Sequence, residues 1–218
     1  MIRIAITPNK IRRDECEYIS TILDAGWDRV HIRHPHIERD TLEKILKGLS
    51  ASHRSRVMIH SHFSLAKEYG CGIHLNKRCR DIPNDYNGEV SQSLHSIKSL
   101  KALNSSGFSV FLNFLKSFGN LKKLKKDLKR KKQSYSYVTL SPIFASISKP
   151  GYSAQWDFTE LKQSLTDTEV PVVALGGITP DKAAWLKNVG FDGYAVLGYL
   201  NEAQSIEELR MRLREFNE

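Results

Sequence analysis

Short apolar runs alternate with amphipathic stretches along most of the chain. Eight runs have the length and composition of buried strands, and strands are expected at 2–6, 30–33, 57–60, 72–75, 89–93, 137–140, 172–175 and 193–197. Between them, apolar residues recur with helical spacing, as in Leu42, Ile45, Leu46 and Leu49. Further helices are expected at 15–25, 63–69, 157–165, 180–189 and 205–216. The pattern therefore predicts a repeated strand–helix unit.

Eight such units in 218 residues match an α/β fold of the (β/α)8, or TIM-barrel, type, in one domain that spans 1–218. A doubly wound open sheet has the same alternation and is the alternative. The ends of the last two predicted strands favour the barrel, because both carry glycines where TIM barrels commonly bind phosphate. Thr179 is expected to cap the helix after the seventh strand, with Pro180 at its first position.

Residues 100–135 do not fit the repeat. Leucines at helical spacing, with lysines between them, run from Leu112 to Leu128. We predict an enlarged basic insert after the fifth strand that contains a long amphipathic helix. A solvent-exposed charged face is the simplest interpretation, and a surface for a protein partner, RNA or anionic lipid is the alternative.

The formal net charge of +9 comes mostly from this insert. Residues 116–132 hold nine Lys or Arg and one Asp, so the remainder is close to neutral. A general basic surface is therefore not indicated, and nucleic acid is not an expected partner.

The sequence predicts no membrane span, because it lacks a run of about 18 apolar residues. Its first residues also lack the apolar stretch of a signal peptide, so a cytoplasmic location is expected. Cys16, Cys71 and Cys79 form no CxxC pair, and their odd number argues against a disulfide framework.

Glycine turns follow the last two predicted strands. Gly176 and Gly177 lie between a strand and a helix start, where free N–H groups attract an anion. Leu197 and Gly198 end the last strand in a similar way. Turns after strands 7 and 8 form the common phosphate site of TIM barrels, so a phosphorylated ligand is expected. Two ordinary glycine turns are the alternative.

Two further segments offer polar groups at the same end of the barrel. The loop 141–151 carries Ser146, Ser148 and Lys149, and lysine is a point charge suited to phosphate. In the second strand, alternation places His31 and Arg33 on one face, and Arg33 can form two parallel hydrogen bonds with a phosphate. A polar surface loop and a structural arginine are the alternatives.

All eight histidines precede residue 96. His34, His36, His60 and His62 follow the second and third strands, which would suit a metal site. They lack the HxxxH and HExxH patterns, and histidines that serve only as hydrogen-bonding partners are the simpler interpretation.

Seven short motifs along the chain are weak signals singly but specific in combination. They are His31-Ile32-Arg33, Leu65-Ala66, Gly72-Ile73-His74-Leu75, Ser93-Leu94-His95, Ser141-Pro142-Ile143-Phe144, Ser148-Lys149-Pro150-Gly151 and Ala174-Leu175-Gly176-Gly177-Ile178. In these the chain resembles the thiamine phosphate synthase family and its relatives, the TenI-type thiazole tautomerases. The similarity covers almost the whole chain outside 100–135.

The resemblance implies an enzyme of thiamin biosynthesis. Such a synthase joins an aminopyrimidine diphosphate to a thiazole phosphate and releases pyrophosphate, with Mg²⁺. The family's pyrophosphate-binding arginine and lysine correspond to Arg33 and Lys149, the expected catalytic residues. The residues expected to bind substrate are His31, His60, Ser93, Ser146, Ser148, Gly176, Gly177, Ile178, Leu197 and Gly198.

The chain departs from the family where the family binds metal. The family's Asn-Asp-Arg after strand 3 is replaced by His60-Ser61-His62, and its Glu-Lys after the arginine by His34-Pro35. Its second magnesium aspartate is not matched after His74, where Asp81 is shifted. Mg²⁺ therefore stays open as a cofactor, and no metal ligand is assigned.

Three functions follow from these observations. The first is a divergent thiamine phosphate synthase acting on small phosphate and diphosphate substrates. The second is a barrel that binds thiazole or thiamine phosphate without chemistry, and the TenI histidine is not matched near Pro142. The third is RNA or surface binding through the basic insert. Each of these functions is compatible with a homodimer. Fold alone does not assign function.

Overall fold

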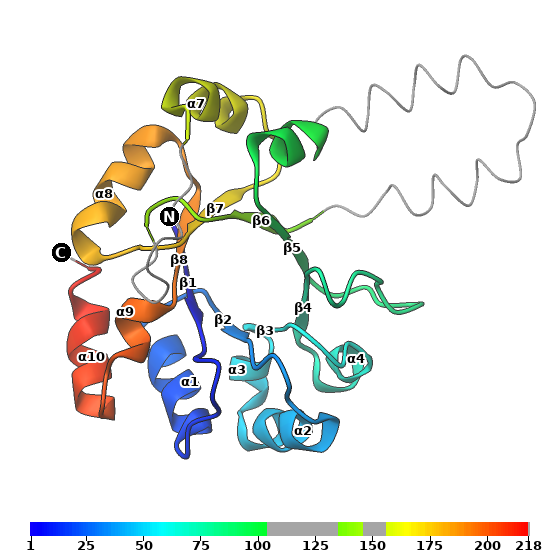
Figure 1. Cartoon of the computed structure of the whole chain (residues 1–218). Helices are drawn as coiled ribbons and strands as arrows, with labels where there is room; N and C mark the ends of the chain where they lie inside the picture. The colour runs from blue at the N-terminus through cyan, green and yellow to red at the C-terminus, as the bar shows by residue number, and fades with distance from the viewer. Residues whose placement is uncertain (104–134, 146–155, 218) are drawn as a thin grey trace, which may run out of the picture.

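Eight parallel strands form a closed barrel in the computed structural model, which describes residues 1–103, 135–145 and 156–217. Each strand pairs with the next along the chain, and the last returns to the first, so that Figure 1 shows a ring of strands with helices outside it. The strands are β1 (Ile2–Ile6), β2 (Arg29–Ile32), β3 (Val57–Ile59), β4 (Gly72–Leu75), β5 (Val90–Leu94), β6 (Tyr137–Leu140), β7 (Val172–Leu175) and β8 (Gly193–Val196). The predicted TIM barrel is confirmed, and the open sheet is wrong.

The helices lie around the outside of this ring (Figure 1). They are α1 (Glu15–Asp24), α2 (Arg39–Gly48), α3 (Ala51–Arg54), α4 (Ser64–Tyr69), α7 (Phe158–Thr166), α8 (Pro180–Val189), α9 (Gly198–Asn201) and α10 (Ile206–Arg214). Residues 97–103 are also helical. Apolar residues of α1, α2 and α10 recur every three or four positions, which places their buried faces against the strands.

Three strands, β2, β3 and β8, end one residue earlier than the apolar pattern predicts. Arg33 and His60 lie just past β2 and β3. The Arg33 amide donates to Thr7 Oγ1, 2.9 Å away, and not to the neighbouring strand. Both residues thus sit where the barrel opens to its connecting loops.

Two four-residue helices, α3 and α9, were not predicted because one turn is too short to show a helical period. Thr179 is the N-cap of α8 and Pro180 begins the helix, as predicted. The Thr179 side chain makes no capping bond, however, and its buried Oγ1 has no partner among the residues that the structure describes.

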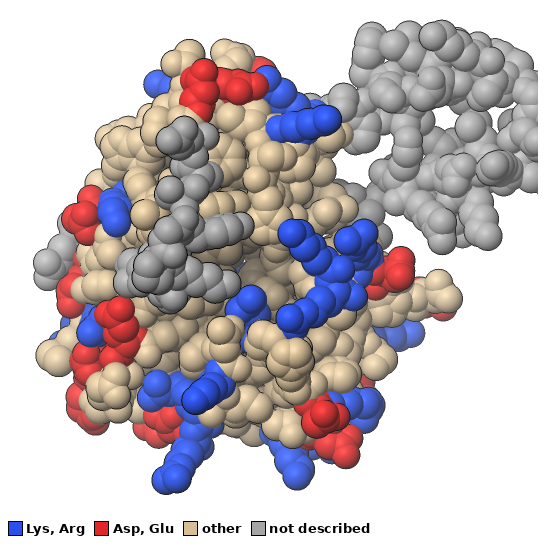
Figure 2. Space-filling model, in the orientation of Figure 1, with Lys and Arg blue, Asp and Glu red and all other residues tan. Residues whose placement is uncertain are grey.

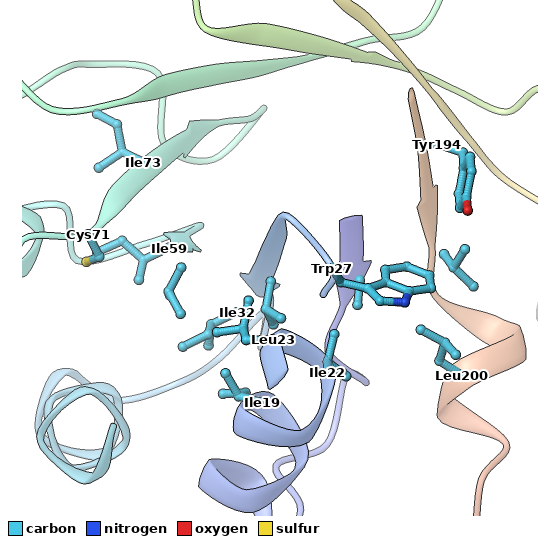
Figure 3. Packing of buried hydrophobic residues seen from close by; sticks show 14 of the residues in the cluster. Ile19, Ile22, Leu23, Trp27, Ile32, Ile59, Cys71, Ile73, Tyr194 and Leu200 are labelled. Carbon is cyan, nitrogen blue, oxygen red and sulfur yellow. The ribbon is translucent and has the colours of Figure 1, made fainter. Parts of the chain in front are cut away.

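The larger apolar core lies between the strands and the helices. Ile19, Ile22 and Leu23 of α1 pack in this layer (Figure 3). Trp27, which follows α1, is fully buried, and its ring meets Tyr194 and Phe216 edge-on at centroid distances of 6.1 and 5.4 Å. Aromatic packing therefore joins the first strand–helix unit to the last.

A smaller core fills the barrel itself. Its buried members come from β1, β3, β6, β7 and β8 and are Ile4, Ile6, Met58, Tyr137, Val173 and Ala195. Polar side chains are also buried inside, among them His31, His74 and Ser91. The barrel therefore has a mixed interior, and its polar part lies below the functional end described next.

The proposed basic insert and its helix at 116–132 fall largely outside the described residues, as do Ser146, Ser148 and Lys149. That 1–218 forms one domain stays a prediction. Within the described ranges, no helix is long and apolar enough to cross a membrane. The three cysteines are free, as expected.

Candidate active site

A cavity of about 440 Å³ opens at the carboxyl ends of the strands. Its walls come from the residues at or just after nearly every strand end, from Ile6 after β1 to Gly198 after β8. In Figure 2 the molecule is hollowed at this place, and Lys and Arg side chains lie along one side of the hollow. This is the end of a TIM barrel at which active sites are built.

Nine of the residues expected from the sequence line this one cavity: His31, Arg33, His60, Ser93, Gly176, Gly177, Ile178, Leu197 and Gly198. They lie far apart in the chain, and the closed barrel brings them together. Their roles stay predictions. The other three, Ser146, Ser148 and Lys149, lie outside the described residues.

Two arginines face the cavity without an acidic partner. Arg33 Nη1 donates to Asn9 Oδ1 at 2.6 Å, and Arg78 Nη1 donates to the Pro35 carbonyl at 2.8 Å. Neither forms an ion pair with any residue that the structure describes. Burial lowers the pKa of Arg33, and the positive charge of Arg78 lowers it further. An anion between these guanidiniums would relieve their mutual repulsion.

The glycine turn after β7 has a left-handed backbone. The φ angles of Gly176 and Gly177 are +105° and +64°, which side chains rarely adopt. A Cβ on Gly177 would overlap the Ala145 carbonyl oxygen, and one on Gly176 would come within 2.9 Å of Pro142 Cα. The glycines therefore let the loop after β6 pack on this turn. That reason differs from the predicted one, which was close approach of a ligand.

The loop after β6 is fastened to this turn. The Ile143 amide donates to the Leu175 carbonyl at 2.9 Å, and the Phe144 amide donates to the Gly176 carbonyl at 3.1 Å. Lys182 of α8 donates to the Gly177 carbonyl at 2.9 Å, and its ammonium lies 5.0 Å from the centre of the Phe144 ring. The backbone at this wall of the cavity is therefore held in place before any ligand arrives.

Three histidines form the floor of the cavity. His31 Nδ1 lies 3.0 Å from His60 Nε2, and His31 Nε2 lies 2.5 Å from the Tyr137 hydroxyl. His74 contacts the hydroxyls of Ser91 and Ser93 through Nδ1 at 2.8 Å and Nε2 at 2.7 Å.

Burial lowers the pKa of all three rings, and neighbouring positive groups lower it further. The pKa of His74 falls to about 3, with Arg33 as the first of these neighbours. The three imidazoles are therefore neutral at pH 7.

The four histidines that the sequence suggests for a metal site, His34, His36, His60 and His62, do not lie together in the structure. His34 turns toward α1, where its Nε2 contacts Glu15 Oε1 at 2.9 Å in a buried pair. His62 Nε2 contacts the Ile37 carbonyl at 2.8 Å, and His36 is exposed. The actual cluster joins His60 to His31 and His74, because alternation turns those two strand residues into the barrel.

Several residues of the cavity wall were not predicted from the sequence. Arg78, Lys77 and Asn76 follow β4 directly, and Asn9 follows β1. The signal for Arg78 and Lys77 is the same as that for Arg33, a basic residue just after a predicted strand. Thr139, in contrast, sits within β6, where no local pattern marks it, and its buried Oγ1 has no partner in the described part of the chain.

The described residues do not fit Mg²⁺, which prefers carboxylate and other oxygen ligands. No Asp or Glu is among the described residues that line the cavity. Asp81 is exposed and lies outside that lining. Positive charge here comes from Arg33, Arg78 and Lys77.

Sequence comparison relates the C-terminal part of the chain to known proteins. Residues 118–200 match the model of the thiamine monophosphate synthase family. The thiamine-phosphate synthase of Chlamydia abortus is 35% identical over 79 residues, which are 36% of this chain and 37% of that protein. That of Albidiferax ferrireducens is 38% identical over 79 residues, again 36% of each chain. The chain thus aligns with little more than a third of these relatives' length.

Structural comparison covers the whole chain. A thiamine phosphate pyrophosphorylase from Bacteroides thetaiotaomicron superimposes with a TM-score of 0.74 and 27% identity, over 100% of this chain and 96% of that one. One from Pyrococcus furiosus has a TM-score of 0.68 over 99% and 93% of the two chains, but its 18% identity shows the fold alone. By sequence over 118–200, and by structure in the comparison with the Bacteroides thetaiotaomicron protein, this chain is similar to the thiamine monophosphate synthase family that its motifs suggest.

Proposed function

We propose that the protein is a thiamine phosphate synthase-like enzyme that joins an aminopyrimidine diphosphate to a thiazole phosphate and releases pyrophosphate. The observation that carries the proposal is that Arg33 and Arg78, which have no acidic partner among the described residues, line the same cavity as the Gly176–Gly177 turn. The relatives named thiamine-phosphate synthase support it.

The two sides of the cavity suit two phosphorylated substrates. Arg33 and Arg78 would bind the diphosphate, because a guanidinium offers two parallel N–H groups to phosphate oxygens. The backbone at Gly177, Ile178 and Gly198 would receive the monophosphate, at the common TIM-barrel phosphate site.

The reaction transfers the pyrimidine methylene carbon. The bond between this carbon and the diphosphate oxygen breaks, and its electron pair leaves with pyrophosphate. The thiazole nitrogen then forms the new carbon–nitrogen bond. Positive charge at Arg33 and Arg78 stabilises the charge that develops on the leaving group.

The test is pyrophosphate release from the two substrates by the full chain. We expect release by the wild type, and a fall of about 100-fold in Arg33→Ala, typical of losing one group that stabilises developing charge. Arg80→Ala is the matched control, since Arg80 is exposed and does not line the cavity. If no pyrophosphate is released with any divalent metal ion added, the proposed enzymatic function is refuted.

A second candidate is a binding protein for thiazole or thiamine phosphate. It is favoured by the lack of acidic side chains among the described cavity residues, where Mg²⁺ would otherwise neutralise a diphosphate. Calorimetry and the pyrophosphate assay together separate the two functions. A binding protein binds the monophosphate in the calorimeter but releases no pyrophosphate from the diphosphate substrate.

A further inference from the structure

The histidines on the cavity floor are spaced like the ligands of one metal ion. One ring nitrogen each from His31, His60 and His74 lies within 4.8 Å of the others. Nitrogens bound to one Zn²⁺ at about 2.1 Å lie roughly 3.0–3.4 Å apart. The His31 Nδ1–His60 Nε2 distance is already 3.0 Å, but in this contact the two nitrogens face each other, so these two rings as well as His74 have to turn for their lone pairs to meet at one ion.

The neighbours of these rings suit such a turn. Ser93 lines the cavity, so its hydroxyl can swing away and free His74 Nε2. Ser91 is fully buried and keeps its contact with His74 Nδ1. Tyr137 holds His31 by Nε2, which leaves Nδ1 as the ligand atom. Metal-binding histidines are commonly oriented in this way by a partner on the second nitrogen.

The chemical state of the rings is also suitable. Metals bind neutral imidazole, and burial keeps the pKa of each ring low, so the rings carry no extra proton at pH 7. The proton in the His31–His60 contact only has to move to the second nitrogen of the same ring. Three nitrogen ligands favour Zn²⁺ and similar transition metals, whereas Mg²⁺ selects oxygen.

We propose that His31, His60 and His74 bind one divalent transition-metal ion, Zn²⁺ first, with a coordination position open to the cavity. Three histidines and an open position are the pattern of catalytic rather than structural zinc. The open position would accept an oxygen of an anionic ligand.

Arg33 limits how strongly an ion can bind. It is close enough to lower the pKa of His60 and His74, so its charge also opposes the metal. An anion that bridges the ion and Arg33 would offset that repulsion. If the proposed function holds, the leaving diphosphate is such an anion. This last step rests on that function, and the metal site itself does not.

The experiment titrates the untagged full chain with Co²⁺ and Zn²⁺ in the absence of any phosphate. We expect one ion per chain, visible Co²⁺ absorption bands, and no displacement by a hundredfold excess of Mg²⁺. X-ray absorption of the zinc-loaded protein should show three imidazoles. A chain without a one-to-one site, or with fewer than three imidazoles on the metal, overturns the proposal and leaves the synthase assay unaffected.

Variants then identify the ligands. His60→Gln and His74→Gln should each weaken Zn²⁺ binding at least 100-fold, with circular dichroism as the folding control. His36→Gln should bind as the wild type, because His36 is exposed and outside the cluster. Cys79→Ser should do the same, although Cys79 lines the cavity and thiolates bind zinc. A 100-fold loss in Cys79→Ser, or none in His60→Gln and His74→Gln when folded, would overturn the three-histidine set.

Discussion

Arg33 and Arg78 place two positive charges at one cavity. Their repulsion lowers the stability of the fold unless an anion binds between them. Arg78 is exposed at the mouth, while Arg33 is partly buried. The two should therefore differ in how strongly salt screens them, because exposed charges are screened more.

Arg78→Ala should weaken diphosphate binding by about 1–2 kcal/mol, as expected for the loss of one charge-assisted hydrogen bond. The loss should shrink as salt rises. Monophosphate binding should change less, because the glycine turn lies across the cavity. Calorimetry at two salt concentrations measures both. An equal loss for the two ligands would mean that Arg78 does not distinguish the diphosphate.

Gly177→Ala tests the packing role of the turn. The substitution forces a side chain onto a left-handed backbone and into the Ala145 carbonyl. Gly190 is the matched control: its φ is +109°, and a Cβ there would meet only Leu165 Cβ, at 3.9 Å.

We expect Gly177→Ala to cost at least 1 kcal/mol more stability than Gly190→Ala, since both carry the backbone penalty and only the first has the clash. Urea unfolding measures the difference. Similar losses would show that the loop after β6 moves aside without cost.

Among the elements, α8 and α10 offer a comparison of helix caps. Ser205 Oγ accepts from the Glu208 amide at 3.1 Å. Thr179 makes no capping bond, and its buried hydroxyl finds no partner within the described ranges. Ser205→Ala should cost about 1 kcal/mol. Thr179→Val, which keeps the shape, should cost nothing or add stability. Thermal unfolding of the two variants ranks them, and a large loss in Thr179→Val would reveal a partner for that hydroxyl.

Much of the fold follows from local pattern. β4, β6, β7 and α8 have their predicted bounds, because a four-residue apolar run or a proline-started helix is marked by its own residues. β2 and β3 end early because Arg33 and His60 lie past the last ladder bond, which a hydrophobic pattern does not show.

The candidate site was only partly predictable. Residues at strand ends, such as Gly177 and Arg33, were predictable because the carboxyl ends of all the strands of a barrel lie at the same end. His74 lies inside β4, and its approach to His31 and His60 depends on the relative alignment of three strands. Arg78 became significant only when the fold placed it beside Arg33.

For the molecule as a whole, the neutral histidines predict acid sensitivity. Their folded pKa lies below the unfolded value near 6.5, so the unfolded chain takes up protons that the folded chain refuses. Stability should be fully present above about pH 6.5 and fall as the pH drops below it. Three rings give at most roughly 4 kcal/mol per pH unit.

Urea unfolding in a metal chelator at several pH values between 7 and 5 measures this slope. His74→Asn should reduce it by about one third, and the exposed His36 supplies the control variant. A stability that does not change across this range would mean that the rings become protonated without unfolding the barrel.

The buried polar contacts inside the barrel also constrain how its strands align. His31, His74, Ser91 and Tyr137 come from four of the five strands β2 to β6, and each finds its partner only if its own strand keeps its position. Sliding one of these strands by a single residue would turn its polar side chain outward into the apolar layer beneath the helices. On the other side of the barrel lie the apolar residues Ile4, Val173 and Ala195. Repacking them after such a slip would cost less free energy than burying an imidazole without a partner. Misaligned barrels are therefore penalised most strongly along the half that builds the histidine floor, so the contacts that shape the site also help to select the correct fold.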